Sequence, residues 1–388
     1  MRVLISTGIG RLHFVPAATA LQRAGVDVTV VTGWRPWRGV LEVTRPFLFL
    51  HQRLEARWSA WGLVKNVKAC GGAELFTQIF VRVFRLLRFP SGCAEAWGWR
   101  LFGWRTRRFL RGMDILHVRS GAGQGGLIKT ARRAGLRVIV DHSIAHPGFL
   151  AERVRAEYVK NEGLWDLALK DCEDADRVVV NSNFVRDTFI RAGFPEEKIR
   201  VVWWGVEPVF KGARRRRCRD GGPLRVLFVG SFDARKGAGC LLRAMELMAE
   251  QGVDVTLDVV GWKGDGGSGR IRSHGVVPHE TVAAFLGEAD VFAFPTLAEG
   301  CARAVMEAMA AGLCVVTTRE SGAPVQENET GFLVPAGDAG ALAGRIEWLA
   351  ANREAVDRVG AAAATLVTRR YTWEAYAAGM DQVYRELR

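Results

Sequence analysis

Two glutamates stand eight positions apart, Glu299 and Glu307, in the segment FPTLAEGCARAVMEAMAAG at residues 294–312. Their spacing alone is a weak signal, since such a pair arises about once by chance in a chain of this length. Their context is more informative. An apolar, strand-like run ends at Phe294, a loop follows with Glu299 at its tip, and a helical pattern begins. Ligands of open α/β sheets bind beyond the carboxyl ends of the strands, so the segment predicts a ligand site.

The start of this helix adds a second kind of chemistry. The N–H groups of Gly300, Cys301 and Ala302 are expected to open the helix, and a helix N-terminus attracts phosphate or a sugar hydroxyl. Glu307 follows two turns later, within reach of ribose hydroxyls. The alternative is that both glutamates are surface residues of an ordinary helix.

The elements that must position this segment alternate between strand and helix. Apolar runs suited to buried strands recur in both halves of the chain with helical patterns between them, which predicts parallel sheets. These runs are residues 2–6, 26–32, 114–118, 136–143 and 176–182 in the first half. In the second half they are 223–231, 253–261, 289–296, and two shorter ones at 314–318 and 331–337. The sequence therefore predicts an α/β protein with two Rossmann-like domains.

The length of 388 residues exceeds what one hydrophobic core usually supports. We expect an N-terminal domain at 1–205, a linker at 206–222 and a C-terminal domain at 223–370. The linker holds a run of four arginines, Arg214 to Arg217, which either binds phosphate or lipid or is a solvated loop.

Composition narrows the class of protein further. The formal net charge of +13 favours anionic partners. The seven cysteines are scattered without a CxxC pair, which argues against a disulfide framework or zinc site and favours the cytoplasm. The N-terminal apolar run is short and interrupted, unlike a signal peptide, and we expect no transmembrane helix.

Residues 76–111 interleave arginines with tryptophan, phenylalanine and leucine. Such a mixture suits an anionic membrane surface, and the inner face of the cytoplasmic membrane is the surface to which the chain would bind peripherally. The alternative is an amphipathic helix packed on the sheet, with arginine stems covering it. Specific recognition of nucleic acid is disfavoured, because no helix-turn-helix, zinc-finger or RNA-binding sheet signature accompanies the charge.

The segment at 294–312 resembles the E-x7-E signature of retaining family 4 glycosyltransferases, which have the GT-B fold of two Rossmann-like domains facing a cleft. Other segments follow in the family's order. They are VVWWGVEPVF at 201–210, GSFDARKG at 230–237, TGFLVPAGD at 330–338 and the terminal helix at 371–388, which in the family crosses back to the first domain.

The resemblance implies a nucleotide-diphosphate sugar as donor, bound in the C-terminal domain. Arg235 and Lys236 would hold the diphosphate in place of a metal ion, so that no metal or other cofactor is needed. Glu299 would hydrogen-bond the sugar and Glu307 the ribose. Gly230 and Gly237 would let the backbone approach the donor.

The resemblance also implies a histidine on the N-terminal side of the cleft. His142 directly follows a strand and is preferred, and His146 is the competitor. Gly8 and Gly10 follow the first strand and would face phosphate or acceptor. They lack the third glycine of a dinucleotide fingerprint.

The chain departs from the family in places that leave the donor open. Cys301-Ala302-Arg303 follows the first Glu-Gly, Trp204 stands where asparagine is usual, and Leu313-Cys314 replaces a common x-Pro. An acidic residue often found before the TG segment is missing near Ala323.

The function that this resemblance implies is transfer of a sugar, with retention, to the hydroxyl of an acceptor glycan or glycolipid. The basic, aromatic segment favours a lipid-linked acceptor, as in polysaccharide assembly. Two alternatives remain: another GT-B enzyme, either an inverting transferase or a nucleotide-sugar epimerase, and a non-enzymatic basic protein that binds lipid or nucleic acid.

Overall fold

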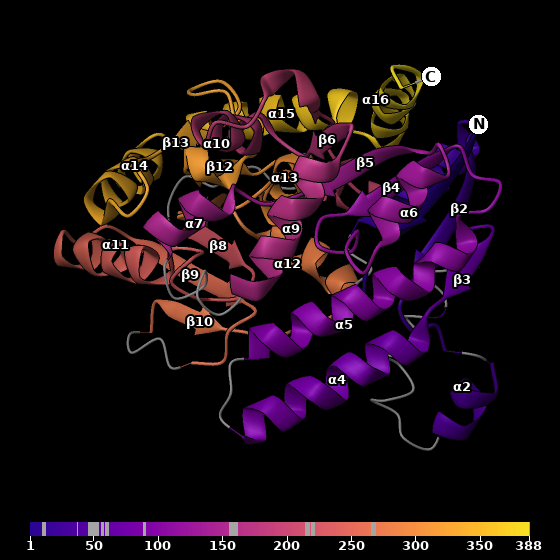
Figure 1. Ribbon diagram of the computed structural model, residues 1–388. Coiled ribbons are helices and arrows are strands. Elements are labelled where there is room, and N and C mark those ends of the chain that lie inside the picture. The colour runs from indigo at the N-terminus through magenta and orange to yellow at the C-terminus, as the bar shows by residue number, and fades with distance from the viewer. Residues whose placement is uncertain are drawn as a thin grey trace.

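The computed structural model describes residues 1–9, 13–36, 38–45, 54–55, 58, 62–87, 91–154, 162–213, 218, 222–264 and 269–387. Within these residues the chain forms two lobes, each a parallel sheet covered by helices (Figure 1). The predicted α/β class is confirmed. Gly10 and the four arginines Arg214 to Arg217 lie outside the described residues.

The first sheet has the strand order β3-β2-β1-β4-β5-β6-β7. Its strands are β1 (Arg2–Ser6), β2 (Asp27–Thr32), β3 (Val67–Ala69), β4 (Ile115–Arg119), β5 (Arg137–His142), β6 (Arg177–Val180) and β7 (Ile199–Val201). The helices of this lobe are α1 (Phe14–Arg23), α2 (Arg38–Thr44), α4 (Gly71–Leu86), α5 (Ser91–Thr106), α6 (Leu127–Arg133), α7 (Pro147–Arg153), α9 (Glu162–Asp174) and α10 (Asn183–Arg191).

The second sheet has the strand order β10-β9-β8-β11-β12-β13. Its strands are β8 (Leu224–Val229), β9 (Val255–Val260), β10 (Ile271–Ser273), β11 (Val291–Phe294), β12 (Cys314–Thr317) and β13 (Phe332–Leu333). The remaining helices are α11 (Ala238–Glu250), α12 (Val282–Glu288), α13 (Arg303–Ala311), α14 (Ala339–Ala351), α15 (Arg353–Arg370) and α16 (Trp373–Arg385).

The central strands of both sheets are almost continuously apolar because helices cover both of their faces. The sequence of β5 is RVIVDH and that of β11 is VFAF, and nearly every residue in them is buried. The strand order reverses between β1 and β4 in one sheet and between β8 and β11 in the other. Crevices open at such reversals, beyond the carboxyl ends of the strands.

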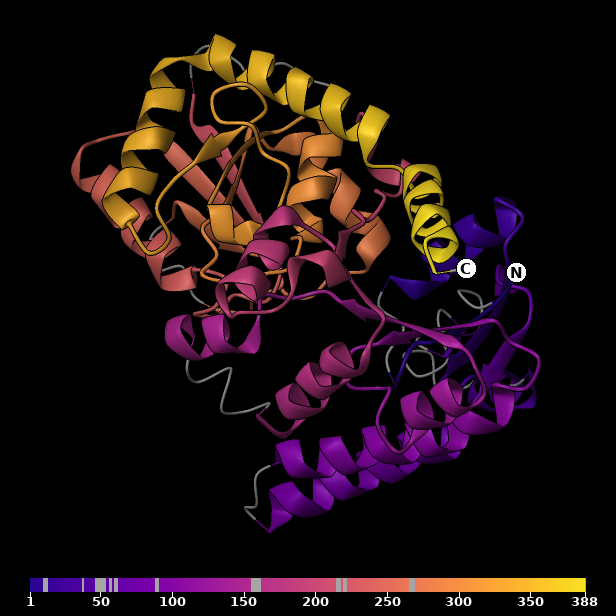
Figure 2. The same ribbon diagram turned by 45° about the horizontal axis from the view of Figure 1, so that its top comes forward.

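The C-terminal helix α16 leaves the second lobe and packs against the first, beside α1 (Figure 2). Its buried side chains Tyr376, Met380 and Tyr384 join the core that contains Phe14 of α1. The hydroxyl oxygen of Tyr384 lies 2.8 Å from Nδ1 of the buried His117 in β4. The end of the chain therefore ties the two lobes together.

Helices α4 and α5 pack side by side along one edge of the first lobe, with α4 outermost (Figures 1 and 2). They account for most of the basic, aromatic segment at 76–111. No helix among the described residues combines the length and the apolar character needed to cross a bilayer.

We predict that Tyr384→Phe destabilises the fold and that Tyr376→Phe does not. The first change leaves the buried His117 Nδ1 without its partner, which costs about 1–3 kcal/mol of unfolding free energy. Tyr376 is the matched control on the same helix, because its buried hydroxyl has no partner in the described structure and its removal should be neutral or stabilising. Urea unfolding of the three proteins tests this, and equal losses for both variants would contradict it.

Candidate active site

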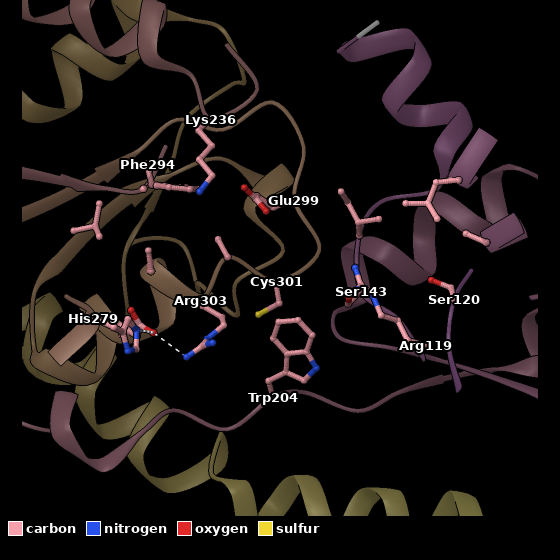
Figure 3. Close-up of a pocket in the computed structure, with 18 of the residues that line it drawn as sticks. Arg119, Ser120, Ser143, Trp204, Lys236, His279, Phe294, Glu299, Cys301 and Arg303 are labelled. Atoms are coloured by element: carbon pink, nitrogen blue, oxygen red, sulfur yellow. Dashed lines mark hydrogen bonds and ion pairs between the residues drawn. The ribbon is translucent and has the colours of Figure 1, made fainter. Parts of the chain in front are cut away.

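A cavity of about 510 Å³ lies between the two lobes, where the strand orders reverse. Figure 3 shows its two walls. Residues of the second lobe lie opposite Arg119, Ser120 and Ser143 of the first. Trp204 lies between them, in the stretch between β7 and β8 that we call the connecting segment. The polar side chains contributed by the second lobe are Lys236, His279, Glu299, Arg303 and Glu307. The sequence signals from distant segments thus meet in one cavity.

Lys236 and Arg235 are adjacent in sequence but point to different partners. Nζ of Lys236 lies in the cavity, 5.6 Å from the centre of the Phe294 ring, and forms no hydrogen bond or ion pair with the described residues. Arg235 instead donates to Oε1 of Glu299 at 2.6 Å and to the carbonyl of Ala298 at 3.0 Å. The uncompensated cation in this part of the cavity is therefore Lys236, and Arg235 orients Glu299.

Glu307 is nearly buried, with 8% of its side chain exposed, and it lines the same cavity. Its Oε1 lies 3.1 Å from Nε2 of His279 and 3.4 Å from a guanidinium nitrogen of Arg303. The hydrogen bond that His279 donates to the Glu307 carboxylate raises the pKa of His279 above its ordinary value. Arg303 also pairs with Glu207 of the connecting segment at 3.1 Å, which joins α13 to the chain between the lobes.

Helix α13 begins at Arg303, after the three residues whose N–H groups were expected to open it. The N–H of Ala302 donates to the carbonyl of Ser321 at 2.8 Å, so it does not face the cavity. The N–H groups of Arg303 and Ala304 open the helix and have no acceptor among the described residues, and both residues line the cavity. Cys301 lines the cavity too, and burial raises the pKa of its thiol to about 12, so it stays protonated.

The glycines of the predicted donor site lie where other parts of the protein pack closely against them. A Cβ on Gly300 would lie 2.0 Å from the carbonyl oxygen of Ser143, and one on Gly237 would lie 2.0 Å from that of Pro295. Gly237 also has a φ of +79°, which disfavours any other residue. Gly230 lines the cavity beneath Lys236.

The two candidate histidines do not line the cavity. His142 is fully buried, with Nδ1 3.0 Å from Oγ of Ser120, and burial lowers its pKa to about 4. His146 caps α7 by accepting from the Gly148 N–H at 3.0 Å. The end of β5 does lead to the cavity, but through Ser143 and Ile144. A role for either histidine at the cleft stays a prediction.

Gly8 follows β1 and packs beneath Trp99, since a Cβ there would lie 2.3 Å from the indole ring. It does not line the cavity.

The nearby His13 stacks on Trp204 with ring centres 4.1 Å apart and lies 2.9 Å from Asp141. Burial would raise the pKa of Asp141, but His13 and His117 outweigh it and hold that pKa below its ordinary value.

Sequence reasoning missed Arg119, His279 and the contribution of Arg303. Arg119 directly follows the predicted strand at 114–118. Because ligands of such sheets bind beyond the carboxyl ends of the strands, the rule that located Glu299 could also have located Arg119. His279 lies in a short 3₁₀ turn before α12 and gave no local signal. Its partner Glu307 is 28 residues away in the chain.

Comparisons with known proteins match both halves of the chain. Residues 13–210 match the profile described as Glycosyltransferase Family 4, and residues 223–352 match the one described as Glycosyl transferases group 1. The chain is also similar in fold to sucrose-phosphate synthase from Thermosynechococcus elongatus, with a TM-score of 0.68 and 20% identity over 100% of this chain and 99% of that one.

Two curated relatives match over shorter segments. The amylovoran biosynthesis glycosyltransferase AmsK of Erwinia amylovora is 35% identical over 40% of this chain and 42% of its own length. The phosphatidyl-myo-inositol mannosyltransferase of Mycobacterium leprae is 37% identical over 41% of this chain and 46% of its own length. The matches thus span less than half of each relative.

The family profile covers just over half of the chain, the two sheets have the arrangement of the GT-B fold, and the E-x7-E glutamates meet in the cleft between the lobes. The family expected from the sequence is confirmed, and this chain belongs to glycosyltransferase family 4.

Proposed function

We propose that this chain transfers a sugar, with retention of configuration, from a nucleotide-diphosphate sugar to an acceptor hydroxyl in the assembly of a polysaccharide or glycolipid. The observation that supports this most strongly is the unpaired ammonium of Lys236 in the cavity between the lobes. A cation without a counter-ion is suited to an anionic ligand, and a nucleoside diphosphate is the anionic leaving group of such a transfer.

The other groups of the second lobe fit the rest of the donor. The free N–H groups at the start of α13 would bind phosphate oxygens, and Glu307 would accept from the ribose hydroxyls. Glu299 would hydrogen-bond the sugar, with its carboxylate oriented by Arg235 at 2.6 Å. This ion pair lowers the nucleophilicity of Glu299, which disfavours a covalent intermediate on it. In this proposal Lys236 and the helix start neutralise the diphosphate without a metal ion.

The acceptor would enter from the first lobe, and we propose that it is presented at an anionic membrane surface. Helix α4 exposes an apolar row of Leu75, Ile79, Val83 and Leu86, spaced so that they share one face. Exposed arginines on α4 and α5, including Arg82, accompany this row. The name of the Mycobacterium leprae relative, a phosphatidyl-myo-inositol mannosyltransferase, agrees with a lipid acceptor. Such a chain would act as a peripheral protein on the cytoplasmic face.

We predict that one nucleoside diphosphate stabilises the wild-type chain and fails to stabilise Lys236→Ala. At a concentration about 100 times its dissociation constant, the ligand should contribute roughly 2.7 kcal/mol, which a thermal-shift screen of UDP, GDP, ADP and their sugar conjugates would detect. EDTA should leave the shift unchanged.

Turnover of Lys236→Ala and Glu299→Ala should each fall by about 10²–10³.

The control for this screen is Lys129→Ala, which removes an exposed lysine of α6 in the other lobe and should behave as wild type. Equal stabilisation of wild type and Lys236→Ala by every nucleotide would reject the proposed donor site.

We predict that the chain co-sediments with vesicles containing phosphatidylglycerol more than with phosphatidylcholine alone. Binding should weaken as salt rises, because screening reduces the attraction of arginines to anionic lipid. Replacing both Ile79 and Leu86 by Asp should lower the bound fraction at least about tenfold, since each buried leucine-sized side chain contributes about 1.5–3 kcal/mol. Val276→Asp is the control, because Val276 is an exposed apolar residue of the other lobe. Equal binding to both kinds of vesicle would refute the membrane proposal.

A further inference from the structure

Arg119 stands at the carboxyl end of β4 and lines the cavity on the wall opposite Lys236 (Figure 3). Its guanidinium lies 4.8 Å from the ring centre of Trp99, which covers one of its faces. The side chain forms no hydrogen bond or ion pair with any other part of the described structure. Its hydrogen-bonding capacity is therefore left for something that enters the cavity.

The surroundings of Arg119 make this arrangement unusual. Burial lowers its pKa to about 10, so it remains charged at neutral pH. The buried carboxylate of Asp141 lies 2.9 Å from His13 and 3.7 Å from His117 and forms no ion pair with Arg119. Arg119 is only partly buried, so its five donors are open to the cavity and have no acceptor in the described part of the protein.

Two hydroxyl groups flank this cation in the same wall. Ser120 is the next residue in the chain and Ser143 follows β5, and both line the cavity. The guanidinium and the hydroxyl of Ser143 can donate to the oxygens of a phosphate group. The hydroxyl of Ser120 lies 3.0 Å from Nδ1 of His142 and donates as well when that ring nitrogen carries the proton. None of the three side chains carries a negative charge. Lys236 and the start of α13 lie on the opposite wall, so these donors form a second anion site.

We propose that Arg119, Ser120 and Ser143 bind a phosphate group carried by the acceptor substrate, close to the hydroxyl that receives the sugar. This inference rests on the proposed function for the identity of the other substrate. It assigns the acceptor to a chemical class, the phosphorylated sugars and alcohols, whether the phosphate belongs to a soluble metabolite or to a lipid diphosphate.

Binding of inorganic phosphate tests this site separately from the donor site. The titration uses the full chain carrying Lys236→Ala, so that the donor-side cation is absent, and compares it with the same chain carrying Arg119→Gln as well. Loss of a charged hydrogen-bond donor should raise the dissociation constant of phosphate about tenfold to hundredfold. Arg119→Lys should retain part of the affinity. Arg133→Gln, which removes an exposed arginine of α6, should retain all of it.

A chemical readout needs no variant at position 119. Phenylglyoxal modifies accessible arginines, and inorganic phosphate should protect Arg119 in the wild-type chain when the modified peptides are mapped by mass spectrometry. Protection should persist when a saturating nucleoside diphosphate occupies the donor site. Glucose should not protect, whereas glucose 1-phosphate should if the acceptor is soluble, and a prenyl diphosphate in detergent should if it is a lipid.

Three outcomes would overturn the inference: equal phosphate affinity with and without Arg119, no protection by any phosphate compound, or loss of protection when nucleotide binds. The last would assign Arg119 to the donor site. If phosphate binding depends on Arg119 while no nucleotide binds the chain, the anion site stands and the proposed function fails.

Discussion

The loop that bears Glu299 is fixed to the first lobe through its backbone. The carbonyl of Glu299 accepts from the Ala145 N–H at 3.2 Å, and the carbonyl of Gly300 accepts from the Ser182 hydroxyl at 2.5 Å. Gly300 lies so close to Ser143 that no side chain fits there. This contact sets where Glu299 and the start of α13 lie relative to Ser143 and Arg119. Both walls of the cavity therefore depend on one close backbone approach between the lobes.

The charged side chains of the cavity fall into two groups, those that form ion pairs and those that do not. Arg235 and Glu299 satisfy each other with 17% of each side chain exposed, and Glu307 is held by His279 and Arg303. Lys236 on one wall and Arg119 on the other have no such partner among the described residues. A partner of opposite charge holds each paired side chain in place and largely cancels its charge. The two unpaired cations keep their full charge and can bind anionic ligands. The cavity is thus suited to two anions facing each other across the reacting groups.

Much of this arrangement was readable from the sequence, because strand-ending loops in parallel sheets converge at one edge. That rule located the segment of Glu299, whereas the family resemblance implied the loop of Lys236 and the histidines after β5. It did not tell which side chain turns into the cavity, so His142 was preferred although Ser143 lines it. Orientation depends on packing from distant elements, here Ser120 and Cys172 around His142. The edge strands β3, β7 and β10 escaped notice because three residues give no periodic signal.

The terminal helix illustrates what local patterns leave out. The family resemblance implied that it returns to the first lobe, and α16 packs beside α1. Its bond from Tyr384 to His117 joins residues 267 positions apart, which no local pattern predicts. The same limit applies to Arg303, whose contacts with Glu207 and Glu307 link the connecting segment to the cavity.

The most direct measurement is the configuration of the glycosidic bond that the chain forms. Wild-type protein would be incubated with the nucleotide-sugar it binds and a phosphorylated acceptor, and the coupling at the anomeric carbon of the product read by NMR. If the donor lies against Lys236 and Glu299 orients the sugar without attacking it, nucleoside diphosphate is released and the new bond has the configuration of the donor. A product of inverted configuration would contradict retention, and no release of nucleotide with any acceptor would contradict the transfer itself.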